Sequence, residues 1–212
     1  MKTPHKAAAG AVALTLALWA VWPSSISKVK NLAASGSNVI AFGDSLTAGY
    51  GAGAGEDYPS RLAGMIDTAV VNAGVSGETT EGALLRLDAD VLARDPRVVI
   101  VGLGGNDFLR SVPIASTEAN LRSIVTRIQG AGAMVILLGF RFPSLAASYE
   151  KMYERVAREE GALLIPDLLD GILRDPSLKS DDIHPNGRGY QVMAERIAGP
   201  TRKLIRKADA SR

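Results

Sequence analysis

Ser45 lies where an apolar run of the sequence gives way to a glycine-rich turn. Residues 39–43, Val-Ile-Ala-Phe-Gly, have the composition of a buried strand, and Gly49 and Gly51 follow the serine. In an open α/β sheet, ligands bind outside the carboxyl ends of the strands, which is the position that this pattern predicts for Ser45. A serine hydroxyl becomes a useful nucleophile only when a base accepts its proton, and acyl transfer also needs donors for an oxyanion. A nucleophilic Ser45 therefore predicts these further groups elsewhere in the chain.

The candidate base is His184. The chain has two histidines, and His5 belongs to the N-terminal segment rather than to the predicted folded body. Histidine suits this task because its pKa lies near neutrality. Asp181, three residues before His184, can lie beside the imidazole within one turn of chain, hold the Nδ1 proton and leave Nε2 facing Ser45. Asp182 is the alternative, but we favour Asp181 because a directly adjacent side chain tends to point away.

Three groups are candidate donors to an oxyanion. They are the backbone N–H of Ser45, the backbone N–H of Gly74 and the side-chain amide of Asn106. A glycine lets the backbone approach a substrate closely. Each such donor stabilises a transition state by roughly 3–4 kcal/mol.

Each of these residues also has a purely structural interpretation. Asp44 and Ser45 are favoured at helix N-caps. Gly74 is an ordinary turn residue, Asn106 suits a turn or cap, and His184 precedes a proline in a loop. Taken alone, Ser45 and Gly74 favour the structural interpretation. Taken together, four separate loops at one predicted sheet edge supply every group that acyl transfer needs, which favours the chemical one.

Apolar runs alternate with helical patterns along the rest of the chain. This alternation predicts parallel βαβ units and a doubly wound, three-layer α/β/α domain. The strands are continuous apolar runs, as expected when both faces of a sheet are buried. The predicted strands are 39–43, 69–72, 97–103, 133–138 and 162–165, and the predicted helices are 59–66, 79–93, 117–129, 146–160 and 187–207.

Composition excludes several classes of protein. The chain has 212 residues, 47% of them hydrophobic, and a formal net charge of +2. Four lysines and no acidic residue precede position 31, so the remaining body carries 2 − 4 = −2. Such a body lacks the clustered basic face of a nucleic-acid-binding protein. The absence of cysteine excludes disulfides and thiol catalysis, and a single histidine in the body makes no credible metal site.

The N-terminus has the pattern of an export signal. Two lysines and a histidine precede residues 7–22, an uncharged and largely apolar run. No clear Ala-x-Ala site follows, so a cleaved signal peptide and a retained membrane anchor both stay open; a buried core helix is a third and weaker interpretation. We expect an exported protein, periplasmic or secreted, or one anchored by residues 7–22. Residues 1–37 are interpreted as this segment plus a linker over 23–37, and residues 38–208 as one domain.

Four blocks of the sequence resemble the ordered motifs of the SGNH, or GDSL, hydrolases. They are Gly-Asp-Ser-Leu at 43–46, Gly74, Gly-x-Asn-Asp at 104–107 and Asp-x-x-His at 181–184. The resemblance covers about residues 38–200. It implies a five-stranded parallel sheet with flavodoxin-like strand order, and hydrolysis without a cofactor or metal.

Carried over block by block, the resemblance implies a role for each matching residue. Ser45 is the nucleophile, and Asp181 and His184 complete a catalytic triad. Gly74 and Asn106 complete the oxyanion hole with the N–H of Ser45.

The stretches 74–80 and 104–110 are similar to the exported thioesterase, lysophospholipase and arylesterase branch of that family. We therefore expect a monomeric serine esterase for aryl, acyl or lysophospholipid esters, and for acyl thioesters, acting through an acyl-enzyme. The expected partner is a small ester or lipid, with membrane contact only through the N-terminal segment. Four residues after the third and fourth strands are expected to line the substrate site: Phe108, Leu109, Phe142 and Pro143.

Other functions stay open as alternatives. The branch often has Pro-x-Asn-x-Gly after the fourth strand, but residues 141–149 lack that asparagine and glycine, so acyl-length preference cannot be inferred. A carbohydrate O-acetyl esterase is the nearest rival, although both tryptophans lie in the N-terminal segment. A non-catalytic binding module would favour loss of a catalytic residue, and none is lost. The glycines of 49–55 resemble a dinucleotide loop, but the second strand ends without the required acid.

Overall fold

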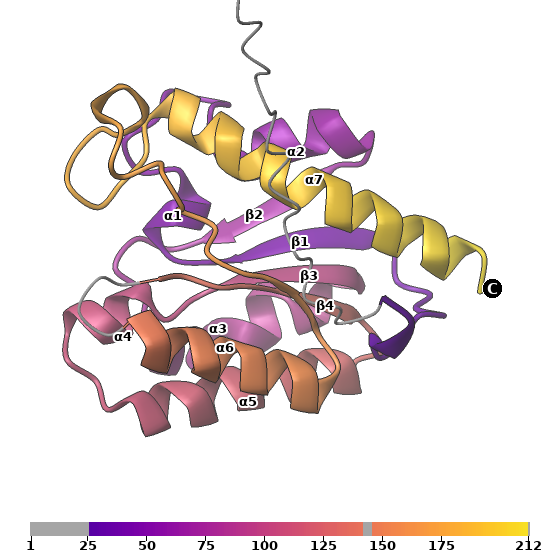
Figure 1. Ribbon diagram of the computed structural model, residues 1–212. Helices are drawn as coiled ribbons and strands as arrows, with labels where there is room; N and C mark the ends of the chain where they lie inside the picture. The colour runs from indigo at the N-terminus through magenta and orange to yellow at the C-terminus, as the bar shows by residue number, and fades with distance from the viewer. Residues whose placement is uncertain (1–25, 142–145, 212) are drawn as a thin grey trace, which may run out of the picture.

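The computed structural model describes residues 26–141 and 146–211, which form one α/β body around a parallel sheet (Figure 1). The five strands have the order β2-β1-β3-β4-β5, so both predictions, the three-layer fold and the flavodoxin-like strand order, are confirmed. Adjacent strands are parallel throughout. The strands are β1 (Asn38–Gly43), β2 (Val70–Gly74), β3 (Pro96–Gly102), β4 (Met134–Leu138) and β5 (Leu163–Ile165).

Helices cover both faces of the sheet. In Figure 1, α2 and α7 lie on one side, and α3, α5 and α6 lie on the other. The central strands β3 and β4 are buried almost completely, because apolar side chains on both of their faces pack against helices. The helices are α1 (Ser45–Ala48), α2 (Tyr58–Ile66), α3 (Thr80–Asp90), α4 (Gly105–Leu109), α5 (Ile114–Gly130), α6 (Ala146–Glu160) and α7 (Gly187–Asp209), with 3-10 turns η1 (Ile26–Lys28), η2 (Leu92–Arg94) and η3 (Pro176–Leu178).

Local capping fixes where the longer helices begin. The side chain of Asp57 accepts a hydrogen bond from the Ser60 N–H at the start of α2. Thr79 caps α3 in the same way, and Asn186 accepts from two N–H groups of α7. Such a side chain satisfies N–H groups that have no partner inside the helix. The predicted helices therefore begin close to where the sequence placed them, except α5, which begins three residues earlier, at Ile114, directly after Pro113.

Two short helices carry residues of the expected site. The prediction treated the segments after the first and third strands as turns, but they form α1 and α4. Neither is long enough to show a hydrophobic period, so pattern reasoning does not detect them.

The segment before β1 is part of the body and is not a free linker. Of the expected linker, residues 26–37 are described, and Val29 and Ala34 are 5% and 4% exposed. The side chain of Asn31 donates to the backbone carbonyls of Gln129 and Ala133, just before β4. The linker interpretation is therefore wrong for this part, because two of its apolar side chains are buried against the body. The polar residues around them are what suggested a linker. Residues 7–22 lie outside the described residues, and among the described helices none has the length and apolarity to span a membrane.

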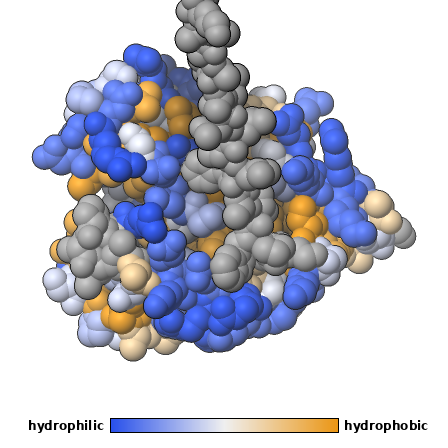
Figure 2. Space-filling model, in the orientation of Figure 1, coloured by the Kyte–Doolittle hydropathy of each residue, from blue (hydrophilic) through white to orange (hydrophobic). Residues whose placement is uncertain are grey.

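The outer helices α5 and α6 are joined by charged side chains. Glu118 of α5 accepts from Arg122 and Arg155, and Arg122 also pairs with Glu159 and Glu160 of α6. The Arg155 hydrogen bond, together with Arg122, holds the pKa of Glu118 below its ordinary value. The network ties the two helices together. Figure 2 shows a hydrophilic area along the lower part of the molecule, the side on which Figure 1 places α5 and α6.

Candidate active site

The turn from β1 into α1 presents Ser45 at the carboxyl edge of the sheet. Asp44 is the N-cap of α1, and its side chain accepts a hydrogen bond from the Leu46 N–H at 3.0 Å. Gly43 allows the turn to be this tight, because a Cβ there would lie 2.2 Å from Thr47 Oγ1 and 2.5 Å from the Gly102 carbonyl oxygen. Ser45 is therefore the first residue of α1, with its hydroxyl at the loop side of the sheet.

Three side chains form a continuous hydrogen-bonded chain at this edge. Ser45 Oγ lies 3.0 Å from His184 Nε2. His184 Nδ1 lies 2.8 Å from Asp181 Oδ2 and 3.0 Å from Asp181 Oδ1. An imidazole held in this way by a carboxylate can accept the serine proton and return it to a leaving group.

Asp181 is held in place by the backbone of its own turn. Its Oδ1 accepts hydrogen bonds from the N–H groups of Ile183 and His184, at 2.9 and 2.8 Å. These bonds, that of Ile183 first, lower the pKa of Asp181, so the carboxylate stays ionised beside the imidazole. Asp182, the alternative, is fully exposed and pairs with Lys179 instead.

Tyr50 covers one side of the imidazole. Its ring centroid lies 4.5 Å from that of His184, with the planes tilted by 46°. The Tyr50 carbonyl accepts a hydrogen bond from the buried Tyr190 hydroxyl at 2.8 Å, which fixes the loop after α1 to α7. The glycine-rich stretch that resembled a dinucleotide loop therefore packs against the histidine, and a Cβ at Gly51 would lie 2.1 Å from Ser180 Oγ.

The side-chain amide of Asn106 reaches the same edge from α4. Its Nδ2 donates to Asp44 Oδ2 at 3.3 Å, so α4 and the start of α1 are adjacent. Gly104, the N-cap of α4, has φ of +110° and allows the chain to leave β3 sharply. No acceptor among the described residues takes the backbone N–H of Ser45, which leaves this donor available beside Asn106.

Gly74 does not have the geometry expected of an oxyanion donor. Its N–H donates to Asn72 Oδ1 at 3.0 Å and is therefore already occupied. A Cβ at Gly74 would lie 2.2 Å from the Ala48 nitrogen and 2.6 Å from the Thr47 carbonyl carbon. Glycine is needed here because the end of β2 packs directly on the backbone of α1, and the oxyanion assignment of Gly74 is corrected accordingly.

Gly77, in the turn after β2, is a different candidate. It has φ of +79°, and its carbonyl accepts a hydrogen bond from Arg110 Nη2 at 2.7 Å. Arg110 directly follows α4, which carries Asn106, so this hydrogen bond brings the turn to the same side of the site. Within the described ranges its N–H has no acceptor. The sequence did show a second glycine, three residues after Gly74, that could have been considered as an oxyanion donor.

Two groups whose supporting role sequence reasoning missed, one buried and one partly buried, hold the site segments together. Asp107 is fully buried and accepts hydrogen bonds from the N–H and hydroxyl of Thr80, which joins α4 to the start of α3. Arg86 donates to the carbonyls of Gly43 and Ala73, the ends of β1 and β2, and its guanidinium lies 4.4 Å from the Phe42 ring centroid. In the sequence, Asp107 and Arg86 look like ordinary charged residues of short helical segments, so their supporting role could not be inferred.

The expected substrate residues have different surroundings. Phe108 is partly buried and packs edge-on against Tyr149, with ring centroids 5.6 Å apart. Leu109 is 52% exposed. Phe142 and Pro143 lie outside the described residues.

Exposed large apolar side chains gather on the loops around Ser45. Five such side chains occur among the described residues, and four of them are Tyr50, Val75, Leu109 and Ile183. Tyr50 follows α1, which begins with Ser45, and Leu109 ends α4, which carries Asn106; Val75 and Ile183 lie in the loops of Gly77 and His184. The fifth, Leu85, lies on α3. We call the four residues the apolar rim.

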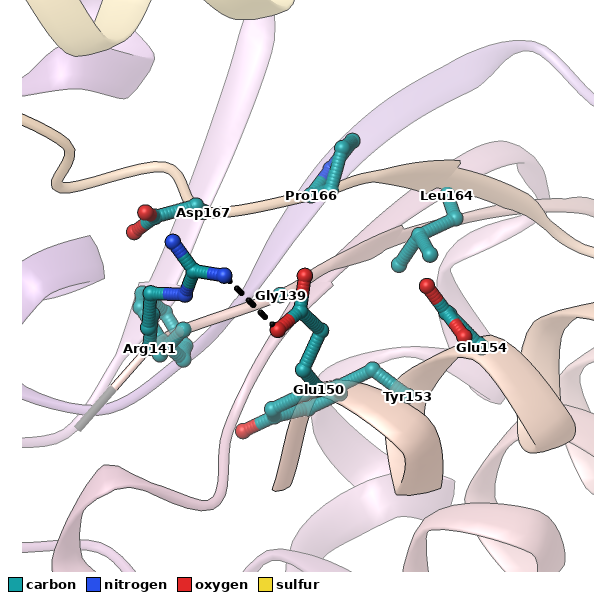
Figure 3. Close-up of a pocket in the computed structure, with 9 residues that line it drawn as sticks. Gly139, Arg141, Glu150, Tyr153, Glu154, Leu164, Pro166 and Asp167 are labelled. Carbon is teal, nitrogen blue, oxygen red and sulfur yellow. Dashed lines mark hydrogen bonds and ion pairs between the residues drawn. The ribbon is translucent and has the colours of Figure 1, made fainter. Parts of the chain in front are cut away.

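A small pocket lies further along the same edge, beyond the ends of β4 and β5. In Figure 3, Arg141 and Glu150 point toward each other, with Arg141 Nη2 3.0 Å from Glu150 Oε2, and Asp167 lies beside the Arg141 guanidinium. Its volume is about 10 Å³, roughly room for one water molecule. A wider hollow of about 310 Å³ adjoins it, next to Arg141, Leu173 and Arg174. Ser45 lines neither of them.

Comparison with known proteins agrees with this geometry. Residues 41–192 match the model of the GDSL-like lipase/acylhydrolase family. The chain is 33% identical to thioesterase 1/protease 1/lysophospholipase L1 of Escherichia coli K12, over 82% of this chain and 87% of that protein. It is 30% identical to an arylesterase of Vibrio mimicus, over 76% and 86% of the two chains.

Solved structures show the same relationship. The crystal structure of TesA superposes with a TM-score of 0.75 and 29% identity, covering 79% of this chain and 99% of that one. The family match over residues 41–192 includes the segments that carry Ser45, Gly77, Asn106, Asp181 and His184. The chain therefore belongs to the GDSL-like lipase/acylhydrolase family, the SGNH hydrolases, and is a serine esterase that acts on ester bonds.

Proposed function

We propose that the protein hydrolyses carboxylic esters and acyl thioesters through an acyl-enzyme on Ser45. The observation that carries the proposal is the uninterrupted contact from Ser45 Oγ to His184 Nε2 at 3.0 Å and from His184 Nδ1 to Asp181 at 2.8 Å. A nucleophile, a base and an orienting carboxylate in this geometry are the parts that acyl transfer requires.

The proposed reaction has two halves. Ser45 Oγ attacks the acyl carbon while His184 Nε2 takes the hydroxyl proton, and the tetrahedral intermediate then expels the alcohol or thiol, which receives that proton. A water molecule then attacks the acyl carbon and gives a proton to His184; the second tetrahedral intermediate expels Ser45 Oγ, which takes that proton back from His184, and the carboxylic acid leaves. Asp181 stays ionised throughout and stabilises the imidazolium.

The negative charge on the intermediate needs donors that are already in place. We assign this role to the N–H of Ser45, the Nδ2 group of Asn106 and the N–H of Gly77. The first and third have no acceptor among the described residues, and Asn106 uses one amide hydrogen for Asp44 and keeps the second. Because these donors are fixed by α1, α4 and the turn after β2, they need little reorganisation during the reaction.

The apolar rim supports substrates with an apolar acyl or aryl group. Tyr50, Val75, Leu109 and Ile183 come from the four segments that carry the site residues, and each is at least 44% exposed. Burying such side chains against a substrate gains about 25 cal/mol per Å² of apolar surface. The relatives named as thioesterase, lysophospholipase and arylesterase have substrates of this kind by name.

The decisive experiment compares the full chain with its Ser45→Ala variant on aryl esters and acyl thioesters. We expect kcat to fall by roughly 10⁴–10⁶ in the variant. Ser123→Ala, which removes a serine from α5, is the matched control and should stay within about twofold of the parent. Equal rates for Ser45→Ala and the parent protein would overturn the proposal.

We further propose that residues 7–22 direct export, so that the protein acts outside the cytoplasm as a monomer, and that the catalytic domain ends near residue 208. The lysines before the apolar run and its uncharged composition support export. Cell fractionation with and without residues 1–22, followed by gel filtration of the released protein, tests both points. Retention of the full chain in the cytoplasm, or a dimer in solution, would contradict them.

A further inference from the structure

Asp44 is a buried carboxyl group that the reaction described above does not use. It is 2% exposed, and it directly precedes the nucleophile, Ser45. Its Oδ1 accepts from the Leu46 N–H at 3.0 Å, and its Oδ2 accepts from Asn106 Nδ2 at 3.3 Å. The Oδ1 contact is that of a helix cap, which a neutral asparagine would serve equally well. The Oδ2 contact therefore needs a separate explanation.

That second contact determines which way the Asn106 amide faces. Within the described part of the chain, Asp44 is the side chain that hydrogen-bonds to the Asn106 carboxamide. A carboxamide has a donor end and an acceptor end of nearly equal size. Asp44 Oδ2 is an acceptor and so selects the orientation with Nδ2 toward the site. In the opposite orientation, the carbonyl oxygen of Asn106 would face a developing oxyanion and repel it.

We propose that Asp44 is a positioning residue that, in its carboxylate form, holds the Asn106 amide in the donor orientation. Asp44 thus does for the oxyanion donor what Asp181 does for the base. The inference rests on the proposed function, because it takes Asn106 as an oxyanion donor. A protonated Asp44 would instead donate from Oδ2 to the carbonyl oxygen of Asn106 and turn the amide around.

The surroundings of Asp44 shift its titration toward neutral pH. Burial raises the pKa of Asp44 to about 6, against the opposing effects of the Leu46 N–H and of His184. The titratable and charged groups that face it come from five elements: His184 from the loop before α7, Asp107 from α4, Tyr58 from α2, Tyr153 from α6 and Tyr190 from α7. His184 is the group among them that favours the ionised form, and Asp107 opposes it.

Two protonations would therefore stop the reaction in acid. His184 must be neutral to act as a base, and Asp44 must be ionised to orient Asn106. The logarithm of kcat/KM should consequently fall with a slope approaching two at the acid end of the profile. An esterase that depends on the histidine alone would show a slope of one.

Asp44→Asn is the informative variant. It keeps an acceptor for the Leu46 N–H but places an NH₂ group against Asn106. We expect kcat to fall by roughly 10²–10³, the loss expected for removing the Asn106 donor, with KM within about threefold of the parent. The acid limb of Asp44→Asn should have a slope of one. Asp57→Asn, which alters the capping carboxylate of α2, is the matched control and should keep the activity and profile of the parent.

A double-mutant cycle isolates the proposed coupling. If Asp44 acts through Asn106, Asp44→Asn should change kcat by less than about threefold when Asn106 is already alanine. Thermal unfolding and labelling of Ser45 by a fluorophosphonate show whether each variant is folded with its nucleophile in place. Losses that multiply in the double variant, or an Asp44→Asn enzyme with the activity and acid slope of the parent, would overturn the inference. Full activity of Asn106→Ala would overturn the oxyanion assignment instead.

Discussion

The hydroxyl oxygen of Ser45 and Nε2 of His184 lie 3.0 Å apart, although 139 positions separate the two residues. The fold achieves this because β1 ends at the carboxyl edge of the sheet and the loop before α7 returns to that edge. Asn186 fixes the return: it caps α7 and donates from its side chain to the carbonyls of Ser177 and Lys179. The contact between Ser45 and His184 thus depends on the strand order of the sheet and on the capped start of α7.

The histidine and its aspartate should contribute unequally to catalysis. His184→Ala removes the base, and we expect kcat to fall by roughly 10⁴–10⁶. Asp181→Asn should cost less, roughly 10²–10⁴, because the Asp181 side chain is 44% exposed and water can partly replace its hydrogen bond to the imidazole. Asp182→Asn is the control and should leave kcat unchanged within about twofold. Steady-state rates on an aryl ester measure all three, and a larger loss for Asp182→Asn than for Asp181→Asn would contradict the assignment.

Gly74→Ala should impair folding rather than the chemical step. The new Cβ would lie 2.2 Å from the backbone nitrogen of Ala48, so β2 and α1 must separate, at a cost of about 1–3 kcal/mol or more. Gly64→Ala, on the exposed side of α2 with no atom within 4 Å of the new Cβ, should instead stabilise the protein by about 0.5–1 kcal/mol.

Urea unfolding of the Gly74→Ala and Gly64→Ala variants tests this difference. A Gly74→Ala protein with parental stability but a kcat lowered by 10² or more would restore Gly74 as an oxyanion donor.

Asp44 should also make stability depend on pH. Its pKa in the folded protein, raised by burial from an ordinary 3.8 to about 6, means that the native state binds more protons than the unfolded state between these values. The contribution of Asp44 to stability is therefore greatest at low pH and declines as pH rises to about 6, by about 3 kcal/mol in total. Asp44→Asn lacks this decline and should gain stability relative to the parent protein between pH 4 and pH 8.

Urea unfolding of the parent and Asp44→Asn proteins at the two pH values measures this gain. A difference between them that is the same at both pH values would show that Asp44 titrates normally. A variant that is more stable at pH 8 but much less active would mean that the buried charge is retained for function at a cost in stability.

The apolar rim should influence the choice of substrate. Leu109→Ser removes an exposed apolar side chain on the same helix as Asn106. We expect kcat/KM to fall more for esters of long acyl chains than for acetyl esters. Each 1.4 kcal/mol of contact energy lost with the acyl chain lowers kcat/KM by roughly 10-fold. Leu85→Ser is the matched control, because Leu85 is 87% exposed but lies on α3 outside the rim. A chain-length series with aryl esters gives the comparison. An equal effect of both variants at every chain length would remove the rim from substrate binding.

The sequence predicted the sheet well because its strands are continuous apolar runs separated by helical periods. Ser45, Asp181 and His184 were also placed together, since parallel strands bring their loops to one edge. The short helices α1 and α4 escaped detection because four or five residues show no period. Residues 26–37 were misjudged because tertiary hydrogen bonds hold this segment on the body: the Asn31 side chain donates to the Ala133 carbonyl just before β4, and the Lys30 N–H donates to the Gly161 carbonyl.

The site itself was predictable in its reactive groups but not in its support. Sequence spacing selects a serine, a histidine and an asparagine by their chemistry. It does not reveal that Asn72 occupies the N–H of Gly74, or that Asp44 contacts Asn106 across 62 positions. These contacts depend on how α1, β2 and α4 pack, and a glycine required for close packing has the same sequence signal as one that binds substrate.

The described chain joins the body at the edge of the sheet opposite to the one that carries the serine. Residues 30–37 run along the amino ends of the strands. There the backbone N–H of Lys30 donates to the Gly161 carbonyl before β5, and the N–H of Asn38 donates to the Asp95 carbonyl before β3. A support attached upstream of this segment would hold the protein by the face at the amino ends of the strands. The opposite face, where substrate reaches Ser45, would stay unobstructed. The protein should therefore keep its turnover when immobilised through its N-terminus on a solid support, and lose it when fixed through Leu109 or its neighbours.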